Sequence, residues 1–95
     1  MKFLEKFGFK KDDIEHLKEN TTSTLIKELE ANKKLVSKNL DYLSNMGVTN
    51  LIEIFIYYHD MFLMDNSNFV EIFNKYDQKD LVEKLAKNVQ IMEYL

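Results

Sequence analysis

The sequence predicts an all-α domain built from short stacked helical hairpins. Three observations support this prediction: there is no proline and there are only two glycines, the chain repeats itself internally, and its apolar residues recur at helical spacing. Proline and glycine clusters are the usual turn signals of β-rich folds, so their scarcity argues against such a fold. A chain of 95 residues is long enough for one modest core, and we expect residues 1–95 to form a single domain.

The internal repeat covers about two and a half units of roughly 30–39 residues. Residues 42–58 (YLSNMGVTNLIEIFIYY) align without a gap with residues 72–88 (IFNKYDQKDLVEKLAKN). Residues 3–20 (FLEKFGFKKDDIEHLKEN) fit the same frame with one extra residue. Self-similarity at this length is typical of stacked helical units.

Each copy of the repeat predicts the end of one helix, a tight turn and the start of the next helix. Gly8 in the first copy matches Gly47 in the second, and Asp77 takes this place in the third. Glycine at this point suits the left-handed backbone that ends a helix. An Asp or Asn followed three residues later by Glu predicts a capping box at the next helix start. This spacing occurs at Asp12 and Glu15, Asn50 and Glu53, Asn68 and Glu71, and Asp80 and Glu83.

In chain order, we expect helices near residues 11–19, 24–45, 50–63, 68–76 and 79–94. The second of these follows an apolar stripe from Leu25 to Leu43 and is either one long helix or two helices that meet near Asn32.

The stretch NLIEIFIYYHDMFLMD, residues 50–65, is the most apolar in the chain. Glu53, His59 and Asp60 interrupt it, so it is too short and too charged to span a bilayer. We expect it to be a central helix covered on both sides. Its predicted core residues are Leu51, Ile52, Phe55, Ile56, Phe62 and Leu63. The alternative is an exposed docking patch formed by Tyr57, Tyr58, Met61 and Met64.

The two ends of the chain are also apolar. A repeat stack needs polar outer faces at its ends to stay monomeric. Either the ends fold back and close a compact globule, or they stay partly exposed. We favour self-association or docking of a protein partner through the C-terminal residues Ile91, Tyr94 and Leu95.

The stretch NLDYLSNMGVTNLIEIFIYYHDMFLMDNSNFVEIFNKY resembles one repeat of the mitochondrial transcription termination factor (mTERF) family. Leu43, Gly47, Val48, Ile52 and Phe55 fit the repeat pattern of leucine, glycine, apolar residue and helix. His59 stands where the family usually has proline. The resemblance implies stacked short helices and a nucleic-acid-binding role.

The charge of the chain is unevenly distributed. Residues 1–38 hold nine lysines and seven acids, whereas residues 39–74 hold five acids and no lysine. The chain has no arginine and a net charge of −3, which argues against sequence-specific DNA reading. The alternative to a protein partner is weak, sequence-independent contact with nucleic acid through Lys10, Lys11, Lys27, Lys33, Lys34 and Lys38.

No group of residues predicts catalysis, a cofactor or a metal ion. The only histidines, His16 and His59, lie in different repeats, and the serines lack a nucleophile motif. With no cysteine there is no thiolate ligand and no disulfide, which suits a reducing cytoplasm. The N-terminal residues lack the continuous apolar core of a signal peptide. We therefore expect a cytoplasmic, non-enzymatic helical binding module with no small-molecule substrate, and with a protein partner ahead of nucleic acid.

Overall fold

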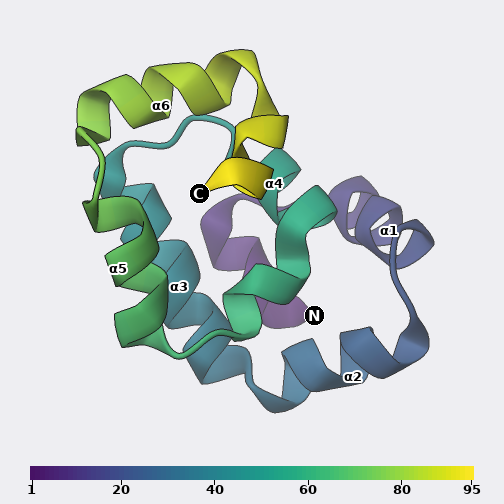
Figure 1. Ribbon diagram of the computed structural model, residues 1–95. Coiled ribbons are helices and arrows are strands. Elements are labelled where there is room, and N and C mark those ends of the chain that lie inside the picture. The colour runs from purple at the N-terminus through teal and green to yellow at the C-terminus, as the bar shows by residue number, and fades with distance from the viewer.

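The computed structural model describes residues 1–95 and contains only helices, which confirms the all-α prediction (Figure 1). Six are α-helices and three are 3-10 helices, labelled η. In chain order they are η1 (Lys2–Phe7), α1 (Lys11–Glu19), α2 (Ser23–Ala31), α3 (Lys33–Met46), α4 (Leu51–Tyr58), η2 (His59–Leu63), α5 (Asn66–Asn74), α6 (Gln78–Lys87) and η3 (Val89–Tyr94).

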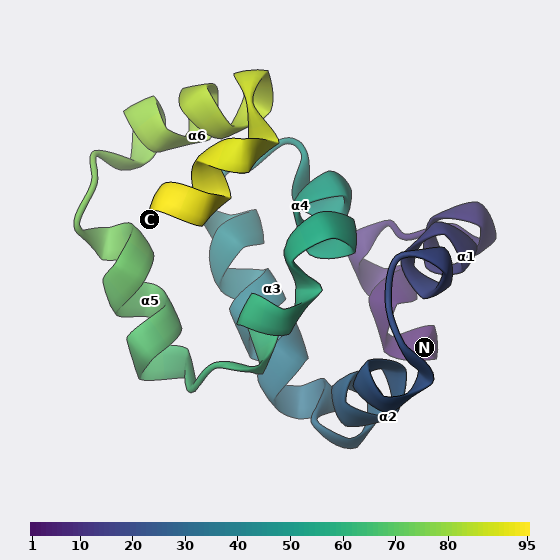
Figure 2. The ribbon, with the colours of Figure 1, turned by 45° about the vertical axis from the view of Figure 1, so that its right-hand side comes forward.

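The three copies of the repeat form three helical hairpins: η1 with α1, α3 with α4, and α5 with α6. The first helices of the hairpins lie in one layer, with α3 between η1 and α5. In the second layer α1 packs against α4, and η3 fills the space between α4 and α6 (Figures 1 and 2). The predicted stack of helical hairpins is therefore present, with α2 packed against α3.

The glycine turns of the first two hairpins have the predicted left-handed geometry. Gly47 ends α3 with φ 102°, and the Val48 N–H donates back to the Leu43 carbonyl at 3.3 Å. Gly8 ends η1 with φ 91°. The third turn is different, because Asp77 has φ −63° and accepts a hydrogen bond from the Asp80 N–H at 2.9 Å. Asp77 is therefore the N-cap of α6 and not a left-handed helix end.

We expect Gly47→Val to lower the free energy of unfolding by about 1–2 kcal/mol, the cost of a left-handed backbone for an L-residue. Nothing lies within 4 Å of the added Cβ, so the cost arises from the backbone and not from a clash. Gly47→Asn is the control, because asparagine tolerates this conformation, and it should cost clearly less. Urea unfolding of both variants measures the difference, and equal losses would contradict the backbone explanation.

The predicted capping boxes are wrong. Helix α1 begins at Lys11, as expected, but its N-cap is Lys10 and Asp12 lies in its first turn; the Lys10 backbone N–H donates to Asp13 Oδ2 at 2.8 Å. Asn68 lies inside α5 and Asp80 inside α6. Asn50 does precede α4, but its amide donates to Glu53 Oε1 at 3.0 Å and to the Leu85 carbonyl at 2.9 Å. Acidic residues are favoured throughout the first turn of a helix, so the Asx-to-Glu spacing does not identify the cap.

The break in the long predicted helix lies at Asn32, where α2 ends and α3 begins. The Asn32 side-chain amide donates to the Glu28 carbonyl at 2.8 Å, and the Asn32 backbone N–H donates to the same carbonyl at 3.0 Å, so Asn32 closes the end of α2. The apolar stripe continues across the break, and its members Leu29, Val36, Leu40 and Leu43 are fully buried.

The predicted helix over residues 79–94 is wrong in its second half. The chain leaves helical geometry at Asn88, with φ −151°, and η3 folds back toward α4. Asn88 Oδ1 accepts from the Gln90 N–H at 3.1 Å and so starts η3. Met92 is buried and anchors η3 in the stack. Ile91 and Leu95 are half-buried, and Tyr94 is exposed.

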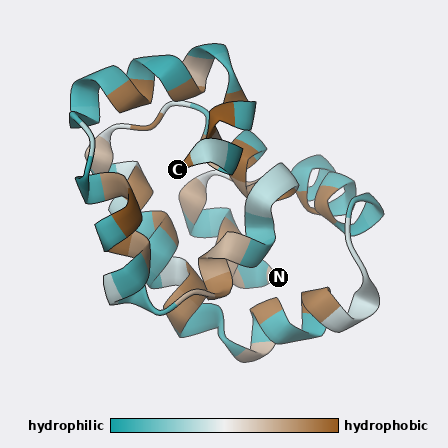
Figure 3. Cartoon of the chain, viewed as in Figure 1, coloured by the Kyte–Doolittle hydropathy of each residue, from teal (hydrophilic) through white to brown (hydrophobic).

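The N-terminal end packs against the core, as expected if the ends fold back to form a compact globule. Leu4 and Phe9 are buried, whereas Met1, Phe3 and Phe7 are half-buried against the core. Figure 3 shows hydrophobic segments facing the middle of the molecule and hydrophilic segments on the outer turns. Tyr94 is thus the one large hydrophobic side chain of the two ends that the fold leaves exposed.

The middle stretch is mainly core, as predicted, with Leu51, Phe55, Ile56 and Phe62 buried and Ile52 and Leu63 half-buried. A row of five phenylalanines links the three hairpins: Phe9, Phe55, Phe62, Phe69 and Phe73. Successive ring centroids in this row are 5.5, 5.0, 5.1 and 4.9 Å apart. Aromatic pairs at such distances add to the free energy gained by burial.

Candidate interaction surfaces

An apolar depression of about 250 Å³ lies where the turn before α6, α6 itself and η3 meet. We call it the C-terminal groove. It is lined by Tyr76, Asp80, Leu81, Lys84, Ile91, Tyr94 and Leu95. The groove exists because the chain reverses at Asn88, which brings η3 back onto α6. Met92 is buried, and the apolar residues of η3 on either side of Met92 line the groove.

Two of the three exposed large hydrophobic side chains lie on the C-terminal groove. Tyr94 is 84% exposed and Tyr76 is 40% exposed. Lys84 Nζ and Asp80 Oδ2, one helical turn apart on the rim, are 3.0 Å from each other. Both side chains are more than half exposed, so this ion pair contributes little to stability.

A second depression, the tyrosine groove, lies between α4 and η3 and measures about 380 Å³. Tyr57, Tyr58, Val89, Gln90 and Glu93 line it. The Tyr58 hydroxyl donates to Glu93 Oε2 at 2.7 Å and so ties η3 to α4. Tyr57 is 50% exposed, and its ring lies edge-on to His16 with the centroids 5.9 Å apart.

The hydrogen bond to Glu93, followed by burial of the hydroxyl and by the charge of Glu93, raises the pKa of Tyr58 from 10.0 to about 12. A pKa that is raised in the folded state stabilises the fold below pH 10, and this stabilisation is lost as the pH rises toward about 12. We expect Glu93→Gln to move the Tyr58 midpoint back toward 10.0. Alkaline titration followed by tyrosine carbon chemical shifts, with Tyr58→Phe to assign the signal, measures this, and an unchanged midpoint would contradict the assigned cause.

The predicted docking residues do not form one patch. Tyr57 and Tyr58 line the tyrosine groove, whereas Ile91, Tyr94 and Leu95 line the C-terminal groove. Met61 and Met64 are half-buried, pack against the core and line neither groove. Tyr76 was not among the predicted residues, because its approach to η3 depends on the chain reversal at Asn88.

The predicted lysines are likewise divided. Lys33, Lys34 and Lys38 meet Lys6 around a depression of about 390 Å³ between η1 and α3, and we call these four residues the lysine cluster. Phe3, Ser37 and Asp41 line the same depression. No carboxylate lies within ion-pair distance of the four ammonium groups. The sequence prediction omitted Lys6, which reaches this place only because η1 packs on α3.

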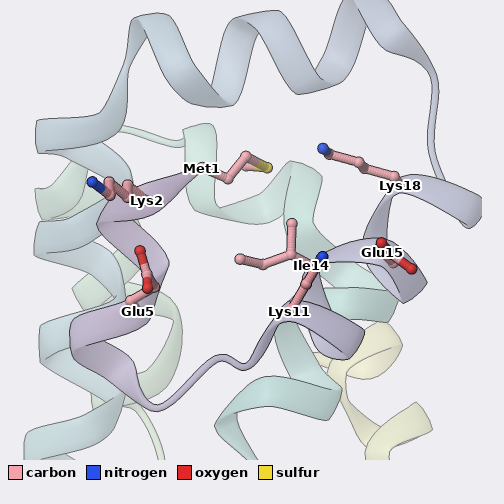
Figure 4. Close-up of a pocket in the computed structure, with 7 residues that line it drawn as sticks. All are labelled: Met1, Lys2, Glu5, Lys11, Ile14, Glu15 and Lys18. Carbon is pink, nitrogen blue, oxygen red and sulfur yellow. The ribbon is translucent and has the colours of Figure 1, made fainter.

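The other three predicted lysines lie outside the lysine cluster. Figure 4 shows Lys11 in a depression with Lys2 and Lys18, which it shares with Glu5 and Glu15. Lys27 is on α2 beside Lys18, and Lys10 precedes α1. The mixed charge around Lys11 makes that depression a poorer place for a polyanion than the lysine cluster.

His59 joins two segments of the fold through hydrogen bonds that involve both of its ring nitrogens. It is buried, and its Nδ1–H donates to the Ile56 carbonyl at 3.0 Å, because a carbonyl can only accept. Nε2 lies 2.8 Å from Thr21 Oγ1 and accepts from that hydroxyl in this tautomer. His59 thereby holds the α1–α2 connection against η2. His16 is exposed, and nowhere in the structure do three or more His, Asp or Glu side chains gather to hold a metal ion.

None of the helices combines the length and the apolar character that a membrane span requires. Comparison of the chain with protein-family models, with curated proteins and with solved structures finds no match.

Proposed function

We propose that this domain is a non-enzymatic binding module that docks a protein in the C-terminal groove. The observation that supports the proposal most directly is the 84% exposure of Tyr94 beside an apolar depression. Buried tyrosines are common energetic centres of protein interfaces, since one ring brings a large apolar area and a polar tip. A charged rim around an apolar centre is the usual organisation of such a surface.

The test uses a photo-activated cross-linking residue in place of Tyr76, in the full chain, in extracts of the source cells. We expect covalent adducts that a second change, Tyr94→Ser, strongly reduces. The same cross-linker at exposed Lys27, which lies outside the groove, is the matched control. Adducts of equal yield at both positions, or none at position 76, would contradict docking in the C-terminal groove.

A second candidate function is weak binding of nucleic acid through the lysine cluster. The observation that favours it is the meeting of Lys6, Lys33, Lys34 and Lys38 around one depression without paired carboxylates. The resemblance of the middle repeat to the mTERF family implies the same class of ligand. Four neutralised phosphates give a shallow salt dependence, with a slope of about −3 to −4 in log affinity against log salt.

Two triple variants test this second function, because they change the net charge equally. Lys33→Glu with Lys34→Glu and Lys38→Glu reverses the lysine cluster, whereas Lys10→Glu with Lys11→Glu and Lys27→Glu reverses lysines outside it. We expect the first variant to abolish fluorescence-anisotropy binding of a mixed-sequence oligonucleotide and the second to retain most of it. Equal losses would mean that only net charge matters, and tight, sequence-selective binding at about 200 mM salt would place nucleic acid ahead of a protein partner.

A further inference from the structure

The C-terminal groove carries both a protruding side chain and a depression on the same small surface. Tyr94 stands out from the wall of the groove, and the depression beside it is lined by Tyr76, Leu81, Ile91 and Leu95. A surface that holds a knob next to a hole is self-complementary. Such a surface can pair with its own copy around a twofold axis, each knob entering the hole of the other chain.

The charges on the rim select the twofold arrangement. Asp80 and Lys84 both face the groove from α6 and are separated by about 6 Å along the helix. Around a twofold axis perpendicular to the helix, two copies of α6 run antiparallel. Asp80 of each chain then faces Lys84 of the other, whereas two parallel copies would bring like charges together.

We propose that the occupant of the C-terminal groove is a second copy of this chain. Tyr94 of each copy enters the groove of the other, and reciprocal Asp80–Lys84 pairs close the rim. This inference rests on the proposed function, that is, on the groove being a protein-docking surface.

The size of this surface predicts a weak, reversible dimer. Two buried tyrosines contribute about 300–500 Å² of interface. Together with the groove walls, the total stays below about 1,200 Å², in the range of transient complexes. We therefore expect dissociation at micromolar concentrations and association toward the millimolar range.

Sedimentation velocity of the full chain, from micromolar to millimolar concentrations, measures the dimer. We expect Tyr94→Ser to weaken association about tenfold or more, as for a central interface residue. Tyr57→Ser is the matched control, because Tyr57 is also an exposed tyrosine but lies in the tyrosine groove, and it should leave association unchanged.

A mixing experiment tests the arrangement of the rim. The Asp80→Lys variant has two cations on the rim, and the Lys84→Asp variant has two anions. Neither variant alone should associate, because like charges face each other in each homodimer. An equimolar mixture of the two should associate at least as well as the original chain. Circular dichroism of both variants verifies that α6 remains folded.

A monomer at all concentrations, or a Tyr94→Ser variant that associates like the original, overturns the inference. The cross-linker at position 76 then separates this failure from that of the proposed function. Groove-dependent adducts with a different protein, from a chain that is monomeric, leave the proposed function standing and the dimer wrong. A monomeric chain that forms no adducts contradicts both.

Discussion

Phe62→Ala is expected to lower the free energy of unfolding by about 3–5 kcal/mol. The Phe62 ring is fully buried in the middle of the phenylalanine row, with its centroid 5.0 Å from that of Phe55 and 5.1 Å from that of Phe69. Its removal leaves a cavity between the second and third hairpins that surrounding rings fill only in part. Because a domain of this size has a total stability of about 5–15 kcal/mol, the variant loses a large share of it.

Urea unfolding followed by circular dichroism measures this loss. Tyr57→Ala is the control, since Tyr57 is a half-exposed aromatic residue in the neighbouring helix α4 and should change stability by only about 0.5 kcal/mol. A loss below about 1.5 kcal/mol for Phe62→Ala would mean that the phenylalanine row does not join the hairpins as the structure indicates.

Replacement of Asn39 has the second large expected effect. Asn39 is fully buried, and its amide donates to the carbonyls of Phe62 at 2.9 Å and Met64 at 3.0 Å. Its Oδ1 accepts from Asn66 Nδ2 at 2.9 Å. These three bonds hold the connection between η2 and α5 against α3. Asn39→Leu keeps the approximate volume but leaves all three partners unpaired, at an expected net cost of about 2–4 kcal/mol.

Asn39→Asp is the sharper variant, because it preserves the shape and removes both donors. An ionised carboxylate then faces two carbonyls, and we expect a loss of about 3–5 kcal/mol at neutral pH. Burial raises the pKa of the introduced carboxyl, and the neutral acid can donate one hydrogen bond. The loss should therefore shrink as the pH falls through that pKa and grow as it rises.

Asn45→Leu serves as the control for Asn39, since Asn45 is exposed on the same helix and should change stability by about 0.5 kcal/mol or less. Asn66→Ala removes one of the three bonds and should cost about 1 kcal/mol. If Asn39→Leu were as stable as the original chain, the buried hydrogen bonds would have no net role in holding the connection.

Features that depend on a few neighbouring residues were predictable from the sequence. Gly47 ends α3 in the left-handed region, and the repeat frame locates the three hairpin turns. The sequence named Asn32 as the place of a break but left one long helix open, and the structure shows two helices there. The apolar stripe of α3 and the core of the middle stretch follow from helical spacing, because one face of each helix must be buried. The capping prediction failed although it was local, because Asp and Asn also occur inside the first turn of a helix, as Asn68 and Asp80 do. At Asn50 the amide instead bonds the Leu85 carbonyl, 35 residues away along the chain.

The candidate surfaces were only partly predictable. Tyr94, Ile91 and Leu95 were recognised as apolar residues near the C-terminal end, and Lys33, Lys34 and Lys38 as neighbouring cations on one helix. The residues that complete each surface, Tyr76 in the C-terminal groove and Lys6 in the lysine cluster, come from other elements. Their positions depend on how segments far apart in the chain pack together. The spacing of residues along the sequence does not contain this information.

By itself, the sequence determined that this chain forms helices, where most of them turn and which of their faces are buried. These properties follow from backbone preferences and from hydrophobic periodicity within about one or two helical turns. Only the tertiary structure decided that η3 folds back between α4 and α6, that four lysines meet between η1 and α3, and that Asn39 is satisfied inside the core. The physical reason is that each of these arrangements gains its free energy from burial or hydrogen bonding between segments far apart in the chain, and such partners are selected only when the whole core assembles.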